Sequence, residues 1–269
     1  MIISLILIIL QCWQLGSNKI KIQVNEQQIL GRNSIEVYVK DTVALSSALS
    51  GPWYAIRPTL KEYDNLSSGP KSFTPVHYTI TEFSTTEILS LTELKPGTYL
   101  FGKGFTDQKS ITSEKPLHRK FPSIAQIVVR TDDTYIGFLT ELLNLPFVIP
   151  PKLVPGYGHQ TDTRVGTDCA ELAIYGRRRM GSKVPYGGPK GIYDYLVPTT
   201  SIKSGTIVHF GYQVSVVYQD SGIKGVLDAE DLLIHAFEDK VSIQKFSSTS
   251  LINQPYQVFE WKEEIANNR

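Results

Sequence analysis

One stretch of the chain, Asp168-Cys169-Ala170-Glu171, combines a thiol with the residue types that begin a helix. Asp168 and Glu171 have the spacing of a capping pair, so we expect a helix that begins at Cys169. The free N–H groups and the positive dipole end of a first turn lower the pKa of a cysteine and can hold an oxyanion. The pattern therefore indicates a cysteine nucleophile. The charge of Asp168 opposes thiolate formation, and a buried, inert cysteine is the alternative interpretation.

A cysteine nucleophile needs a base that accepts its proton. His159 lies on the loop before Cys169, whereas His209 and His235 lie on strands expected after it. In a two-residue hairpin, His209 would point to the opposite face of the sheet from Gln213. Each of the three histidines is a candidate base, and a structural role is the alternative for each.

Residues 123–269 are expected to form the domain that positions this cysteine. Helical spacing at 134–145 and a proline-rich loop precede the helix at Cys169. Four apolar segments with strand character then follow at short spacing, which predicts an antiparallel meander and an α+β domain. These segments are residues 205–210, 213–220, 231–237 and 241–246.

Residues 18–108 have a different character. Short segments of alternating apolar and polar residues, separated by turns rich in Gly, Pro, Asn and Ser, predict a β-sandwich of immunoglobulin type. Residues 109–122 are polar, contain two prolines and are expected to be a linker.

The stretch from Pro155 to Gly176, together with the order of elements after it, resembles the cysteine motif of the NlpC-type cell-wall peptidases, a papain-like family. The resemblance covers about residues 125–245 and implies a papain-like domain in which Cys169 is the nucleophile. It implies that His235 orients the base and that the substrate is a peptidoglycan stem peptide.

The base position of that family is occupied here by Gln213, which cannot take a proton from a thiol at neutral pH. His235, His209 or His159 would then have to serve as the base. Gln213 would instead be a donor to the oxyanion or the substrate. The remaining candidates for binding at this site are Tyr157, which matches a family tyrosine before the cysteine, His159 and Asp168.

The amino-terminal residues predict export. The apolar run at 2–10 is too short to span a bilayer and fits a secretory signal, so residues 1–17 are expected to be a signal segment. Cys12 is a candidate for lipid attachment, which would be the only link to a membrane. We expect a periplasmic or cell-surface protein that contains a single thiol.

Composition excludes several function classes. A net charge of +1 gives no basic excess for nucleic-acid binding, and no His/Cys cluster has zinc spacing. No metal or cofactor is expected. The run Arg177-Arg178-Arg179 is interpreted as favourable charge at a helix end, with a carboxylate clamp for an anionic peptide as the alternative.

Two main functions remain open. The first is an exported thiol hydrolase that cleaves amide bonds in stem peptides through Cys169. The second is a non-catalytic NlpC-like domain that binds a cell-wall or surface ligand, which Gln213 favours. A surface interaction protein that works mainly through its sandwich is a weaker third interpretation.

Overall fold

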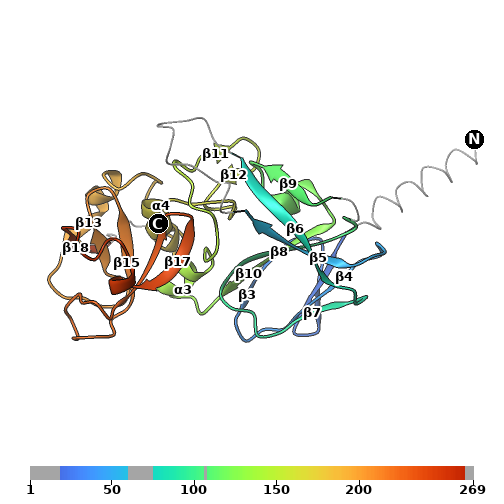
Figure 1. Ribbon diagram of the computed structural model, residues 1–269, viewed down its shortest axis with the longest axis horizontal. Coiled ribbons are helices and arrows are strands. Elements are labelled where there is room, and N and C mark those ends of the chain that lie inside the picture. Colours follow the sequence, from blue (N-terminus) through green and yellow to red (C-terminus); the bar gives the residue numbers. More distant parts are fainter. Residues whose placement is uncertain (1–18, 60–74, 106–107, 264–269) are drawn as a thin grey trace, which may run out of the picture.

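The computed structural model describes residues 19–59, 75–105 and 108–263. The expected signal segment at 1–17, with Cys12, lies outside these residues. The described chain is rich in strands, has few helices and forms two sheet-based domains side by side (Figure 1). This is an α+β architecture. Among the residues described, no helix has the length and apolar character needed to cross a membrane.

Two sheets form the first domain and enclose its main core. Ile22, Leu45, Trp53 and Ile127 come from both sheets and are fully buried between them, as alternation along half-buried strands requires. The first sheet has the order β2-β1-β4-β7, with β1 (Lys21–Val24), β2 (Gln27–Ile29), β4 (Val43–Ser46) and β7 (Leu89–Leu91). The second sheet has the order β3-β10-β8-β5-β6-β9, with β3 (Ser34–Tyr38), β5 (Trp53–Pro58), β6 (Val76–Ser84), β8 (Gly97–Lys103), β9 (Ser110–Ser113) and β10 (Ile124–Arg130).

The first domain extends further along the chain than the sequence predicts. Residues 109–122, expected as a linker, contain β9, which pairs with β6, and the short helix α2 (Leu117–Lys120). Strand β10, expected to open the second domain, lies between β3 and β8, parallel to β3 and antiparallel to β8. The change of sheet therefore falls after Arg130 and not at residue 122, because the apolar side chains of β10 complete the first core.

The second domain combines helices with one antiparallel sheet. Its sheet has the order β13-β18-β14-β15-β16-β17, with β13 (Leu196–Pro198), β14 (Ile207–His209), β15 (Val214–Gln219), β16 (Leu232–Phe237), β17 (Lys240–Lys245) and β18 (Gln257–Trp261). The expected meander corresponds to β14 through β17. The other elements are α3 (Tyr135–Thr140), β11 (Leu153–Val154), β12 (Gly158–His159), α4 (Cys169–Arg179) and the 3-10 helices at Gly191–Tyr195 and Phe246–Ser248.

Helix α4 lies against one face of this sheet. Its buried side chains form a cluster with Val214 of β15 and with Ile234 and Ala236 of β16. The alternate residues Val217 and Leu233 belong to a separate cluster on the other face. Because successive side chains of a strand point to opposite faces, this alternation decides which residues of β15 and β16 face α4.

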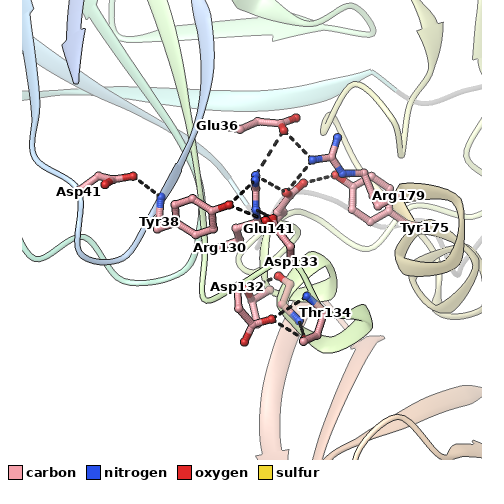
Figure 2. Close-up of polar contacts among 12 residues, drawn as sticks. Glu36, Tyr38, Asp41, Arg130, Asp132, Asp133, Thr134, Glu141, Tyr175 and Arg179 are labelled. Atoms are coloured by element: carbon pink, nitrogen blue, oxygen red, sulfur yellow. Dashed lines mark hydrogen bonds and ion pairs between the residues drawn. The ribbon is translucent and has the colours of Figure 1, made fainter. Parts of the chain in front are cut away.

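Charged side chains connect the two domains (Figure 2). Glu141 follows α3, and its carboxylate is fully buried. It accepts hydrogen bonds from Arg130 of β10 at 3.3 Å, from Arg164 in the loop before α4 at 2.7 Å, and from Arg179 of α4 at 3.1 Å. Arg164 and Arg179 also pair with Glu36 of β3 at 2.7 and 2.6 Å. The network therefore links the end of α4 to the second sheet of the first domain.

Candidate functional site

The candidate site begins where α4 begins. Asp168 is the N-cap, and its side-chain oxygen accepts a hydrogen bond from the Glu171 backbone N–H at 2.8 Å. This is the start predicted by the capping pair, and it places Cys169 in the first turn. Both carboxylic acids are buried, Asp168 at 7% exposure and Glu171 at 4%.

The thiol of Cys169 is buried and holds its proton. Desolvation, followed by the negative charge of Asp168, raises its pKa to about 12. The backbone N–H groups of Val214, Ala170 and Cys169 act in the opposite direction but do not compensate. The expected lowering of the thiol pKa by the helix start is therefore wrong, because burial outweighs the dipole and donor groups.

The two acids beside the thiol have raised pKa values, about 7 for Asp168 and about 9 for Glu171. Burial is the largest cause that raises the pKa of Asp168 and of Glu171, and for Glu171 the charge of Asp168 adds to it. Glu171 accepts a hydrogen bond from the Thr161 hydroxyl at 2.6 Å. No cationic side chain of the described residues contributes to the pKa of Cys169, so a thiolate there has no cationic partner.

His159 lies closest to these acids among the candidate bases. Its Nδ1 is 3.5 Å from a carboxylate oxygen of Glu171, and its ring stacks on Tyr186 at 4.2 Å between centroids. Burial lowers the pKa of His159, while the pKa of Glu171 is raised. The contact therefore joins two neutral groups at neutral pH, rather than forming an ion pair.

Gln213 directly precedes the residue whose backbone contacts the thiol. The backbone N–H of the following residue, Val214, approaches the sulfur of Cys169. The paired ladder between β15 and β16 begins only at Val216, and the Gln213 amide fills part of this gap by donating to the Val214 and Ala236 carbonyls at 3.2 and 3.0 Å. The amide is thus used to satisfy the backbone.

His209 is held by its own neighbours. The hairpin between β14 and β15 has two residues, with Phe210 N–H bonded to the Gln213 carbonyl, so His209 pairs with Val214 and lies on the opposite face from Gln213, as expected. Its Nε2 is 2.8 Å from the Pro189 carbonyl, and its Nδ1 accepts from the Gly211 N–H at 2.9 Å. Both ring nitrogens are therefore engaged, and neither is free to take a proton from Cys169.

His235 lies on the far face of the sheet from α4. Its neighbours Ile234 and Ala236 face α4, so His235 points to the other side, where it stands opposite Ser242 of β17. Its Nε2 is 3.0 Å from the Gln244 side-chain oxygen, and burial lowers its pKa. No hydrogen bond joins Cys169 to a histidine within the described part of the chain.

Tyr157 contacts the first domain. Its carbonyl accepts a hydrogen bond from Arg119 of α2 at 2.8 Å, and the Lys115 ammonium lies 5.1 Å from its ring centroid. These contacts place Tyr157 at the junction of the domains, and its expected role in binding stays a prediction.

The three arginines at the end of α4 have partners within the chain. Arg179 joins the Glu36 and Glu141 network, and the guanidinium of Arg178 lies 4.6 Å from the Tyr186 ring centroid. The guanidinium of Arg177 lies 5.7 Å from the Trp261 ring centroid. The three arginines therefore take part in tertiary contacts, in addition to placing positive charge at the end of the helix.

Two hydrogen-bond partners were not identified from the sequence, Thr161 of Glu171 and Gln244 of His235. Only the second could have been found, because His235 and Gln244 lie diagonally across the hairpin between β16 and β17. Among the described residues, no group of three or more His, Cys, Asp or Glu side chains is arranged to hold a metal ion.

Comparison with known proteins adds no relative. No family model, no curated protein and no solved structure matches the chain.

Proposed function

We propose that this chain is an exported, non-catalytic binding protein. Its second domain would be an NlpC-like, papain-related domain that binds peptidoglycan, and its first domain an immunoglobulin-like sandwich. The observation that carries the proposal is the state of Cys169, a buried thiol with a pKa near 12 and no hydrogen-bonded histidine among the described residues. A nucleophilic cysteine needs a partner that removes its proton.

The arrangement of possible partners supports the same conclusion. Gln213 stands where the resemblance requires the base, and its amide donates to backbone carbonyls. His209 has both ring nitrogens engaged, and His235 faces away from α4. The site therefore has the elements of a thiol hydrolase but lacks the proton transfer that would start the reaction.

Thiol reactivity tests the non-catalytic part of the proposal. We would measure the rate of Cys169 alkylation by iodoacetamide against pH in the protein that begins after residue 17, with Cys169→Ala as the blank. We expect a slow rate that stays low through neutral pH and increases strongly when urea unfolds the protein. A rate that persists below about pH 7 and collapses in His235→Ala or His159→Ala would overturn the proposal.

Sedimentation with purified peptidoglycan sacculi tests the binding part. We expect wild type and Cys169→Ala to sediment equally, because binding would not require the thiol. Protein that stays in the supernatant at every concentration of sacculi would refute the peptidoglycan ligand. A loss of sedimentation only in Cys169→Ala, with unchanged folding, would argue for a direct contribution of the thiol.

A thiol hydrolase is the second candidate. The observation that favours it is that backbone N–H groups of Val214, Ala170 and Cys169 act on the sulfur, as they would on a thiolate or an oxyanion. New amino groups released from sacculi by wild type, and not by Cys169→Ala, would establish this function. We expect no release by wild type, and the variant Gln213→His tests whether restoring a base is enough to begin it.

A further inference from the structure

A cavity lies where two central strands of the first domain diverge, away from Cys169. Strands β5 and β8 pair from Trp53 opposite Lys103 to Ile56 opposite Leu100. Beyond this point Arg57 pairs only with β6, and the start of β8 pairs only with β10. The resulting fork is lined from both strands and encloses about 400 Å³, a volume within the range of small-molecule sites.

Both domains contribute to this cavity. The strands of the fork supply one side, and Leu145, Pro146, Val165 and Lys240 of the second domain line it as well. The contact between the domains at Glu141 holds these segments together, because Arg164 is fixed to Glu36 and Glu141 by two contacts of 2.7 Å. The cavity is thus part of the assembled protein and depends on both domains.

The walls are apolar and aromatic. Phe83 and Phe101 line the cavity with their ring centroids 5.3 Å apart, and Tyr99 stacks on Phe101 at 6.4 Å. Leu91 and Leu94 add aliphatic surface. Phe83 is 47% exposed, so its ring can provide a contact surface for a ligand's apolar body.

The charge in the cavity is positive. Arg57, Arg164 and Lys240 line it, and none of the described lining residues is acidic. Arg164 is neutralised by its two glutamates, whereas Arg57 and Lys240 have no ion pair with any described residue. Two unpaired cations beside apolar walls favour an anionic ligand, because charge-assisted hydrogen bonds strengthen where water is partly excluded.

We propose that this cavity binds a small organic anion, a carboxylate, sulfonate or phosphate attached to an aromatic or branched aliphatic body. Arg57 and Lys240 would hold the anionic group, and Phe83, Phe101 and the two leucines would cover the apolar body. The inference concerns a different site from Cys169 and stands whether or not that thiol reacts.

Fluorescence titration with two dyes tests this proposal. The anionic probe is 8-anilinonaphthalene-1-sulfonate, and the neutral probe with a similar body is N-phenyl-1-naphthylamine. We expect the sulfonate to bind the full protein at one saturable site. In the double variant Arg57→Gln/Lys240→Gln its affinity should fall at least about tenfold, while the neutral dye changes by less than about twofold.

Matched variants separate this site from general attraction. The double variant Lys21→Gln/Lys183→Gln removes the same charge from exposed positions and should leave both dyes unchanged. Phe83→Ala should weaken both dyes, whereas Tyr212→Ala, which truncates another exposed aromatic residue, should weaken neither. All variants must keep the wild-type thermal midpoint, since a loosened core also binds such dyes.

Three results would overturn the proposal. The first is equal sulfonate affinity in wild type and Arg57→Gln/Lys240→Gln. The second is an equal loss in the exposed-lysine double variant, which would indicate attraction by net charge alone. The third is weaker binding in Tyr212→Ala with none in Phe83→Ala, which would place the dye elsewhere.

Discussion

Replacing Glu141 should show how strongly the two domains depend on each other. Its carboxylate is fully buried and meets three guanidinium groups, with a further hydrogen bond from the Tyr175 hydroxyl. Figure 2 shows the carboxylate between Arg130 and Arg179. In Glu141→Gln the shape is kept, but three cations lose a shared anion in a region with little water.

The expected cost follows from this burial. Removing one partner of a buried ion pair costs roughly 3–5 kcal/mol, because the remaining charges stay desolvated. The side chains of Arg164 and Arg179 are 9% and 27% exposed and keep Glu36, so we expect the lower end, about 3 kcal/mol. Glu36→Gln, at 34% side-chain exposure, should cost about 1 kcal/mol.

Urea unfolding followed by tryptophan fluorescence measures both effects. The protein that begins after residue 17 lacks Trp13 and keeps two tryptophans. Trp53 lies in the core of the first domain and Trp261 in β18 of the second, so the backgrounds Trp261→Phe and Trp53→Phe of this protein report the domains separately. We expect Glu141→Gln to lower the midpoint seen by both tryptophans. Glu260→Gln, which breaks the exposed pair with Lys203, is the control and should change stability by less than about 0.5 kcal/mol.

The reasoning would be refuted by a loss below about 1 kcal/mol in Glu141→Gln, or by equal losses in Glu141→Gln and Glu36→Gln. A midpoint change confined to one tryptophan would show that the network stabilises a single domain and does not join the two. The double variant Glu141→Gln/Arg179→Gln adds a coupling measurement, and we expect less than the sum of the two single losses.

Three further predictions concern Cys169 and the residues considered as its partners. Burial raises the pKa of Glu171, so the folded protein retains a proton that the unfolded chain releases above the ordinary carboxyl value. Stability should therefore fall with rising pH, by up to about 1.4 kcal/mol per pH unit, and urea midpoints at about pH 6 and pH 8 should differ less in Glu171→Gln than in wild type. Asp168→Asn keeps a capping side chain but removes a charge that raises the Cys169 pKa, so alkylation at about pH 9 should be faster than in wild type; an unchanged rate would leave desolvation as the whole cause. His209→Phe should lower stability by about 1–2 kcal/mol through its lost hydrogen bonds, yet leave the alkylation profile of Cys169 unchanged, and a changed profile would mean that His209 acts on the thiol.

Local features of the sequence predicted the local features of the structure. The capping pair gave the start of α4, and the two-residue turn gave the pairing of Phe210 with Gln213 and hence the face of His209. Each depends on residues a few positions apart, where backbone geometry and hydrogen bonding leave few alternatives.

Long-range pairing was not predictable in the same way. Strand β10 is apolar along nearly its whole length, which fits a strand covered on both sides but does not name its neighbours. Its partners β3 and β8 are distant in the sequence, and β18 inserts between β13 and β14 from the end of the chain. Alternation within a segment fixes a strand's faces and leaves its place in the sheet open.

The electrostatics of the candidate site depended on burial, which no spacing pattern contains. A helix start favours a thiolate only while the thiol has access to water or to a cation. Cys169 has neither: Asp168 and Glu171 beside it are buried acids with raised pKa values, and burial lowers the pKa of His159, which contacts Glu171. These side chains are buried and packed together without a cation. A single change such as Gln213→His would have to give up the hydrogen bonds that the Gln213 amide donates to the Val214 and Ala236 carbonyls. Restoring reactivity should therefore require both a base and greater access of water to the sulfur.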